Sequence, residues 1–362
     1  MGQRERDICR GYPPVKIFWT PKVNSGLVCR QTATVDRKGW KISNLAQGLI
    51  VQRDDVVAAA ERIGGLVEKT PLIESEIGGR RVWLKCECLQ TGGAFNLRGA
   101  TNRLLQLSGD EKARGVVAFS SGNHARGVAI AARRLGIKAI IVMPADAPQV
   151  KVDGTRAEGA QIVFYDRRTE SREAISAQIS DETGAVIVPS FDDPAIVAGQ
   201  GTAGLEILEQ FGGSPPRIVI PCGGGGLASG IALAVPDAEI VIVEPDGWDD
   251  MKQSLEQGEI VPVEPDAPAT ILDALQTPRV SPITFGILKA RNARALSVSD
   301  DEAGEAMRFA WERHGLTVEP GGAAALAALL SGKLAPVEDT VVVVSGGNVD
   351  PELHARITAR AA

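Results

Sequence analysis

Short apolar runs that alternate with helical segments restrict the fold of this 362-residue chain more than any other feature. Residues 115–119, 139–143 and 186–188 are too short for buried helices and lack the polar alternation of a strand with one wet face. Such runs are typical of parallel sheets that helices cover on both faces. The sequence therefore predicts an α/β fold with parallel sheets, and its length favours two lobes.

Residues 1–50 differ from the rest of the chain in both pattern and charge. They show no sustained helical or alternating period, and Pro13, Pro14, Pro21 and Gly26 interrupt them. They carry nine Lys or Arg against three Asp or Glu. We interpret them as a flexible N-terminal extension ahead of a domain that begins near Val51. A transit peptide is the alternative that the basic balance leaves open.

The remaining residues are acidic, with 30 Lys or Arg against 42 Asp or Glu, which argues against a nucleic acid as partner. No uninterrupted apolar run is long enough to span a membrane. The five cysteines include one closely spaced pair, Cys86 and Cys88, without a second pair or matching histidines for a zinc site. Reduced cysteines in a cytoplasmic protein are the expectation.

Four consecutive glycines, at positions 223–226, are the strongest local signal. They follow the apolar run 217–221 and precede the helical run 227–235. Uncovered backbone N–H groups at the positive end of a helix suit a phosphate group. No Lys-Ser or Lys-Thr pair follows, so a nucleoside-triphosphate loop is not matched. Glu244, about twenty residues further on, leaves a dinucleotide site open as a minor alternative.

Three further loops carry polar or aromatic groups beside a predicted strand or helix. Residues 120–124 read Ser-Ser-Gly-Asn-His, residues 345–348 read Ser-Gly-Gly-Asn, and residues 90–100 form a loop and helix that include Phe95. Hydroxyls and N–H groups in such loops can hold a ligand at the carboxyl end of strands. Taken singly, each has an ordinary structural explanation as well: a helix cap, a tight turn and a core phenylalanine, respectively.

Together, and in this order, the four motifs resemble those of the fold-type II pyridoxal-phosphate enzymes, in the branch of serine and threonine dehydratases and serine racemases. The resemblance covers about residues 55–355. It implies the tryptophan synthase β-like architecture, in which the cofactor lies between two lobes. We expect a large cofactor-binding lobe from residues 51–112 and 192–362, and a small substrate lobe from residues 113–191.

The resemblance also implies a role for each motif. The glycine run, with the following leucine, would hold the cofactor phosphate, and Ser345 would bond the pyridine nitrogen. Asn123 would contact the ring hydroxyl, while Ser121 would hold the substrate carboxylate and act as an acid–base group on the opposite face of the ring. A glutamate forms part of the pocket wall. The implied cofactor-binding residues are Phe95, Asn123, Gly223, Gly224, Gly225, Gly226, Leu227, Glu319 and Ser345.

Part of this branch also has a divalent-cation site. The matching groups are Glu244, the carbonyl of Trp248, and Asp250. Oxygen ligands of this kind suit Mg²⁺ or Ca²⁺. A solvated acidic turn is the alternative interpretation of the same residues.

One position departs from the family pattern in a way that affects the chemistry. The family has a lysine six residues after the glutamine that matches Gln90, and this chain has Asn96 there. That lysine forms the Schiff base with the cofactor and moves the α-proton. An asparagine amide can do neither, because it has no basic lone pair and no titrating proton. Two other lysines, Lys85 and Lys151, do not match this position.

The resemblance implies β-elimination of water from a small β-hydroxy amino acid such as serine, threonine or hydroxyaspartate, giving a 2-oxo acid and ammonia. It also implies a homodimer. Because of Asn96, a protein that binds pyridoxal phosphate without turnover stays open beside the ammonia-lyase, and nucleotide binding at the glycine run is the third hypothesis.

Overall fold

The computed structural model describes residues 50–120, 122–147 and 149–359. Residues 1–49 of the predicted extension, and Ser121, lie outside the described residues. The helices are α1 (Arg53–Ile63), α2 (Asn96–Leu105), α3 (Gly109–Arg114), α4 (Asn123–Leu135), α5 (Gln149–Ala157), α6 (Arg172–Thr183), α7 (Pro194–Phe211), α8 (Gly226–Ala234), α9 (Asp250–Gln257), α10 (Pro282–Ala290), α11 (Asp300–His314), α12 (Pro320–Leu330) and α13 (Pro351–Thr358). Short 3-10 turns cover Glu87–Leu89 and Asp273–Leu275.

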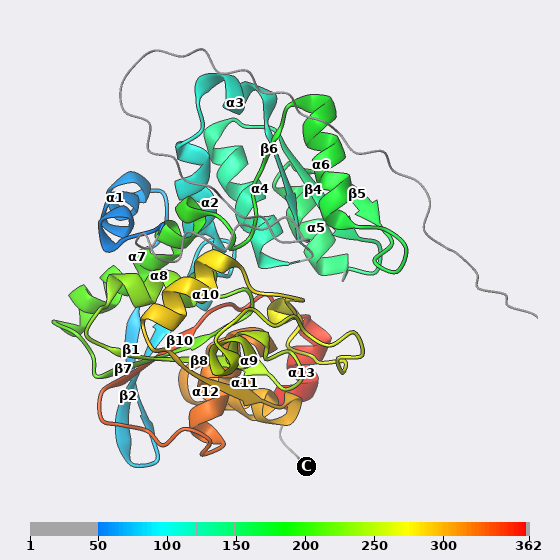
Figure 1. Cartoon of the computed structure of the whole chain (residues 1–362). Coiled ribbons are helices and arrows are strands. Elements are labelled where there is room, and N and C mark those ends of the chain that lie inside the picture. Colours follow the sequence, from blue (N-terminus) through cyan, green and yellow to red (C-terminus); the bar gives the residue numbers. More distant parts are fainter. Residues whose placement is uncertain (1–49, 121, 148, 360–362) are drawn as a thin grey trace, which may run out of the picture. The chain divides into compact units, whose positions relative to one another are not determined.

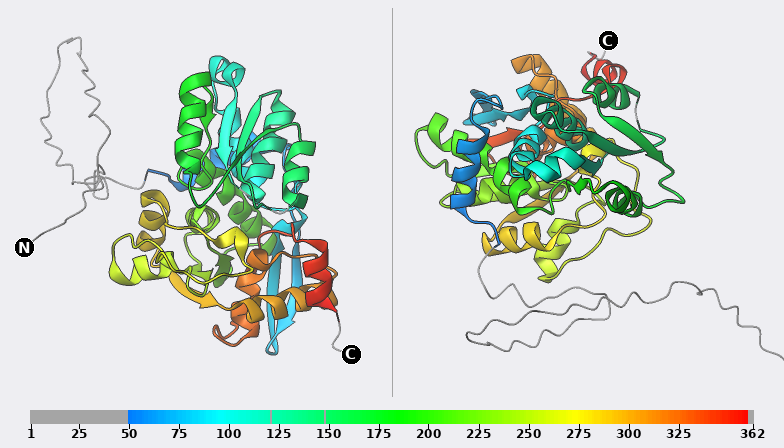
Figure 2. Two further views of the ribbon diagram at one scale, coloured as in Figure 1. Left: turned by 90° about the vertical axis from the view of Figure 1, so that its right-hand side faces the viewer. Right: turned by 90° about the horizontal axis from the view of Figure 1, so that it is seen from above.

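The strands form two separate sheets, which Figures 1 and 2 show in different regions of the described chain. The larger sheet has the order β1-β2-β10-β7-β8-β9 and the smaller has the order β5-β4-β3-β6. The strands are β1 (Leu72–Ile77), β2 (Arg80–Cys86), β3 (Val116–Phe119), β4 (Ala139–Pro144), β5 (Gln161–Tyr165), β6 (Val186–Ile187), β7 (Arg217–Pro221), β8 (Glu239–Pro245), β9 (Arg294–Val298) and β10 (Thr340–Val344).

The central strands of the larger sheet are buried on both faces. Val341 and Val343 of β10 pack in one hydrophobic cluster, which includes residues of α1, α7, α8 and α10. Val342 and Val344, which point the other way, pack in a second cluster with α11 and α12. This two-sided burial explains the uninterrupted apolar runs, because a strand covered by helices on both faces has no solvent-facing side.

The smaller sheet follows the same rule with a different set of helices. Its strands β3 to β6 pair in parallel. One of its clusters contains Ala118, Ile141 and much of α4, together with residues of α2. Helix α2 therefore packs with this sheet although it precedes residue 113 in the chain, and the lobe boundaries given above stay a prediction.

The predicted α/β fold with parallel sheets is confirmed, with one exception at an edge. Strand β1 pairs antiparallel with β2, from Leu72 opposite Lys85 to Ile77 opposite Arg80. Neither β1 nor β9 was predicted as a strand, because both lie at the edges of the sheet and most of their residues are half-buried or exposed, so no apolar run marks them. Within the part of the chain that the structure describes, none of the helices combines the length and the apolar character that crossing a bilayer requires.

Candidate active site

Most of the motifs follow neighbouring strands of the larger sheet, at the carboxyl ends of those strands. The loop that leads to Asn96 follows β2, Ser345 follows β10, the glycine run follows β7, and Asp250 follows β8. Because these four strands are parallel and adjacent, their carboxyl ends lie along one edge of the sheet. Open α/β sheets bind their ligands at this edge.

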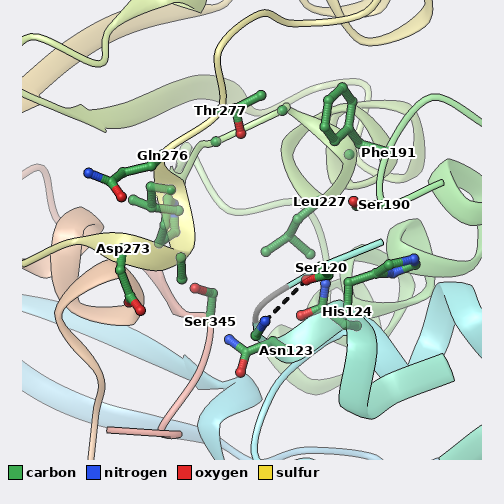
Figure 3. A pocket seen from close by; sticks show the side chains of 18 of the residues that line it. Ser120, Asn123, His124, Ser190, Phe191, Leu227, Asp273, Gln276, Thr277 and Ser345 are labelled. Carbon is green, nitrogen blue, oxygen red and sulfur yellow. Dashed lines mark hydrogen bonds between the residues drawn. The ribbon is translucent and has the colours of Figure 1, made fainter. Parts of the chain in front are cut away.

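A single cavity of about 150 Å³ collects the predicted residues. Figure 3 shows the side chains of Asn123, Leu227 and Ser345 around this space. The cavity brings together all of the predicted site residues that the structure describes, apart from those assigned to a metal: Phe95, Asn96, Asn123, Gly223, Gly224, Gly225, Gly226, Leu227, Glu319 and Ser345. Ser120 and Gly122, the two neighbours of Ser121, also line it.

The glycine run presents bare backbone at the start of α8. The amide of Ser229 donates to the carbonyl of Gly225 at 2.9 Å, so the amides ahead of it belong to the first turn, where a helix provides no acceptor. A side chain at Gly224 would place its Cβ 2.1 Å from the ring of Phe191. Only glycine fits there, and the backbone N–H groups stay open to an anion at the positive end of the helix dipole.

A polar wall of the cavity comes from the start of α4, the residue before α12 and the residue after β10. Glu319 is buried, and its Oε1 accepts a hydrogen bond from Nδ2 of Asn123. Burial raises the pKa of Glu319 to about 7, while the charge of Lys151 acts in the opposite direction. Ser345 is 5% exposed, and its carbonyl accepts from the amide of Phe95 at 3.2 Å. The loops after β2 and β10 are therefore joined at the cavity.

Asn96 is the first residue of α2 and is 8% exposed. Its Oδ1 atom is buried without a hydrogen-bond partner among the described residues. Its backbone packs closely on α4, because a Cβ at Gly127 would lie 3.1 Å from the carbonyl carbon of Asn96. The amide thus occupies the cavity wall at the position where the resemblance requires an amine.

The two other lysines named above differ sharply in their surroundings. Lys85 is fully buried, and its Nζ donates to Glu206 at 2.6 Å and to the carbonyl of Thr70 at 2.7 Å. Lys151, in contrast, lines the candidate site and forms an ion pair with Asp273. The sequence did not predict Lys151 as a site residue. It sits on α5, far along the chain from the glycine run, and no local motif marks it.

Other lining residues were also missed. Phe191 packs against the glycine run, Arg172 lies near Phe119 with its guanidinium carbon 5.3 Å from the ring centroid, and residues 273–277 form one side of the cavity. Phe191 belongs to the Ser-Phe-Asp-Asp-Pro run of residues 190–194, which follows β6 and also resembles the dehydratase branch, but it was not predicted as a site residue. Arg172 and residues 273–277 belong to no polar motif after a strand, so only the tertiary structure identifies them.

The predicted metal ligands lie outside this cavity, at the carboxyl end of β8. Glu244 is buried and accepts from the amides of Met251 at 3.0 Å and Lys252 at 2.8 Å. Both carboxylate oxygens of Asp250 are buried without a hydrogen-bond partner among the described residues. Burial, and next the charge of Asp250, raises the pKa of Glu244. The indole of Trp248 donates to the carbonyl of Pro268 at 2.8 Å.

The fold and the cavity together are typical of an α/β protein with a ligand site at the carboxyl ends of parallel strands, and the glycine run gives this site a place suited to a phosphate group. A family model described as "Pyridoxal-phosphate dependent enzyme" matches residues 63–346. The chain therefore belongs to this family of pyridoxal-phosphate dependent enzymes.

Individual relatives agree with this assignment. The chain is 45% identical over 312 residues to an L-threo-3-hydroxyaspartate ammonia-lyase of Pseudomonas sp, which covers 84% of this chain and 97% of that protein. The solved structure of maize serine racemase is similar with a TM-score of 0.80 and 36% identity, covering 84% of this chain and 96% of that one. The solved structure of a threonine deaminase from T.th. has a TM-score of 0.76 and 41% identity, covering 82% and 98%.

The residues present fit the noncovalent binding of pyridoxal phosphate. The bare amides before Ser229 suit the phosphate, and the hydroxyl of Ser345 and the amide of Asn123 line the same cavity. They do not fit covalent attachment at position 96, because the buried amide of Asn96 is not a nucleophile.

Proposed function

We propose that this chain carries the active site of a pyridoxal-phosphate dependent ammonia-lyase for a small β-hydroxy amino acid such as serine, threonine or hydroxyaspartate. The observation that carries the proposal is the convergence of four separate loops on one cavity. The relatives named for hydroxyaspartate ammonia-lyase and threonine deaminase activity support the substrate class. Water would be eliminated from the substrate to give an enamine, and hydrolysis by a second water would then release ammonia and a 2-oxo acid.

Each group of residues has a physical task in this proposal. The amides of residues 223–226 would bind the phosphate, and Asn123 would donate to the ring oxygen. The neutral hydroxyl of Ser345 would form a hydrogen bond with the ring nitrogen. A neutral partner suits elimination because it does not over-stabilise a carbanion at the α-carbon. When bound, pyridoxal phosphate would supply the electron sink for charge at the α-carbon. Ser121, outside the described residues, stays the proposed acid–base group.

A second candidate function is supported by Asn96. A protein with this site and no lysine at position 96 would hold pyridoxal phosphate, or a preformed adduct of it with an amino acid, without turning it over. The position of Lys85 supports this alternative. Its buried Nζ forms hydrogen bonds with Glu206 and the carbonyl of Thr70, and Lys85 does not line the cavity.

The binding site itself is tested with two ligands that differ only in the phosphate. We expect the full chain to bind pyridoxal phosphate at least about 100-fold more tightly than pyridoxal in equilibrium dialysis, because each hydrogen bond to a charged group contributes about 1.5–3 kcal/mol. Borohydride treatment followed by mass spectrometry should leave position 96 unmodified. Equal affinity for the two ligands would remove the phosphate site from the proposal.

The proposal includes a Mg²⁺ or Ca²⁺ ion between Glu244 and Asp250. The buried oxygens of Asp250, which lack any other partner among the described residues, support it, because buried carboxylates usually pair or coordinate a metal. No group of three or more His, Cys, Asp or Glu side chains suited to a metal occurs in the described part of the chain. The carbonyl of Trp248 or water would have to complete the coordination.

Adding Ca²⁺ or Mg²⁺ to chelator-treated protein should therefore raise its thermal midpoint. An ion at a hundred times its dissociation constant stabilises the folded state by about 2.7 kcal/mol. Asp250→Asn should abolish this response. Asp246→Asn removes the same charge from an exposed position nearby and should retain it. A midpoint that stays constant when either ion is added to the unmodified chain would contradict the site.

A cytoplasmic location and a homodimer complete the proposal. The described cysteines, Cys86, Cys88 and Cys222, are free and buried, which supports a reducing compartment. The dimer is supported by the family resemblance, and we expect a small amino acid rather than a macromolecule as the partner at the site.

A further inference from the structure

A directional chain of hydrogen bonds runs behind the polar wall of the cavity. Nη1 of Arg126 donates to Oδ1 of Asn348 at 2.9 Å. Nδ2 of Asn348 donates to Oδ1 of Asn123 and to the carbonyl of Gly92, both at 2.8 Å. Nδ2 of Asn123 then donates to Glu319 in the cavity wall. These hydrogen bonds therefore link Arg126, which lies one turn after Asn123 on α4, to Glu319, which lines the candidate site.

The chemistry of the fixed partners sets the direction of this chain. An asparagine amide can turn end for end, and only its partners decide which end is oxygen. Arg126 has only donors and the carbonyl of Gly92 is only an acceptor, so Asn348 must offer oxygen to the first and NH₂ to the second. The NH₂ of Asn348 in turn requires the oxygen of Asn123. The NH₂ of Asn123 is thus left for Glu319 and the cavity.

Two glycines of the sequence motifs make room for this chain. A Cβ at Gly93 would lie 2.4 Å from Oδ1 of Asn348. A Cβ at Gly346 would lie 2.0 Å from Oε1 of Glu319. Both positions lie outside the phosphate-binding run, so phosphate binding does not account for them. The amide and carboxyl groups of the hydrogen-bond chain fill the space that a Cβ would take at both positions, and at Gly93 the φ of +78° also favours glycine.

We propose that Arg126 is a positioning residue that fixes, through Asn348, which end of the Asn123 amide faces the cofactor pocket. The inference rests on the proposed function, because it is the ring oxygen of bound pyridoxal phosphate that requires a donor from Asn123. Without Arg126, the two asparagine amides keep only the Gly92 carbonyl and the carboxyl group of Glu319 as outside partners. Because burial raises the pKa of Glu319 to about 7, this carboxyl group is partly protonated near neutral pH, and it can then donate to an amide oxygen as well as accept from an amide NH₂. The amide of Asn123 then presents its oxygen part of the time, and an oxygen cannot donate to the ring.

The first test measures the affinity and the absorption spectrum of bound pyridoxal phosphate in full-length variants. Arg126→Met should weaken binding about 3- to 10-fold, as expected for one partly lost hydrogen bond, and shift the absorption band of the ring. Arg126→Lys keeps a donor-only group and should restore both. Arg133→Met, on an exposed turn of the same helix, is the control and should change neither. Unchanged affinity and spectrum in Arg126→Met would overturn the inference.

A double-mutant cycle separates positioning from general structural support. If Arg126 acts through Asn123, Arg126→Met should have no further effect on affinity in an Asn123→Ala background. Additive losses in the double variant would show that Arg126 supports the pocket in another way, and would overturn the proposed role.

The free protein provides a readout that needs no cofactor. In full-length protein labelled with ¹⁵N at asparagine, the side-chain NH₂ resonance of Asn123 is identified by its loss in Asn123→Ala. It should move in Arg126→Met and return in Arg126→Lys. An unmoved resonance would overturn the inference. Failure of the unmodified chain to bind pyridoxal phosphate would instead overturn the proposed function, while this resonance would still decide the orientation of the amide.

Discussion

Asn96→Lys should release 2-oxo acid from serine, threonine or hydroxyaspartate at least about 10³ times faster than the unmodified chain, since positioned acid–base groups contribute about 10²–10⁴-fold. The variant supplies the two properties that the amide lacks: a nucleophile for the cofactor and a group that can carry the α-proton. Asn96 already lines the cavity at the start of α2, so no rearrangement of the backbone is needed. The measurement is 2-oxo acid release with each substrate, with and without added pyridoxal phosphate.

Matched variants make this result interpretable. Asn96→Met fills similar space without an amine and should stay as inactive as the unmodified chain. Borohydride reduction should fix the cofactor at position 96 in Asn96→Lys only. Rapid turnover by the unmodified chain would contradict our account of Asn96. Lys151→Met in that chain would then show whether the amine that lines the cavity replaces the missing lysine.

The loops that build the site could be predicted because each carries its signal locally. A buried strand followed by glycines or hydroxyls can be recognised within about ten residues, and parallel strands bring such loops to one edge. The convergence of Ser345, Asn123 and the glycine run on one cavity is what this reasoning required. The fold class followed from the same short apolar runs, since central strands such as β10 have no exposed face.

Residues that reach the site through tertiary contacts could not be predicted in this way. Lys151 lies on α5 and Asp273 in a short turn more than a hundred residues later, and their ion pair forms only when the chain is folded. Edge strand β1 was missed because its residues are mostly half-buried or exposed, so no apolar period marks it. The pattern of apolar residues within a strand or helix indicates which positions are buried. Contacts between segments that are distant in the sequence produce no such local pattern.

A second feature that no sequence pattern predicts is a buried network of charges beneath α2. Arg98, two residues after Asn96, is fully buried. Its guanidinium donates to both oxygens of Glu87 at 2.8 Å, and to the two oxygens of Glu206 at 2.6 and 2.8 Å. Lys85 donates to the same carboxylate of Glu206. This network fixes the helix that carries Asn96 into the cavity.

The charges of the network are mutually dependent. Burial by itself would raise the pKa of Glu87, but the charge of Arg98 and its hydrogen bonds outweigh burial, and the pKa is lowered overall. A carboxylate with a lowered folded pKa contributes stability above its unfolded pKa of about 4.3, and this contribution is lost as the pH falls through the folded pKa. Removing Arg98 would leave Glu87 buried without its main partner.

Arg98→Met should therefore reduce the free energy of unfolding by about 3–5 kcal/mol at neutral pH, the usual cost of leaving a buried ion without its partner. Urea unfolding measures this loss, and Arg167→Met, which removes an exposed partner of Asp146, should cost much less. In Arg98→Met the pKa of buried Glu87 should rise above its unfolded value, so that protonation relieves the penalty. The difference between variant and unmodified chain should then begin to shrink above about pH 4.3, as the pH falls through the raised pKa of Glu87 in the variant, and should shrink further below about pH 4.3 as the unmodified chain loses its own contribution. A loss no larger than that of Arg167→Met, or one that stays constant with pH, would show that the network does not hold α2 in place.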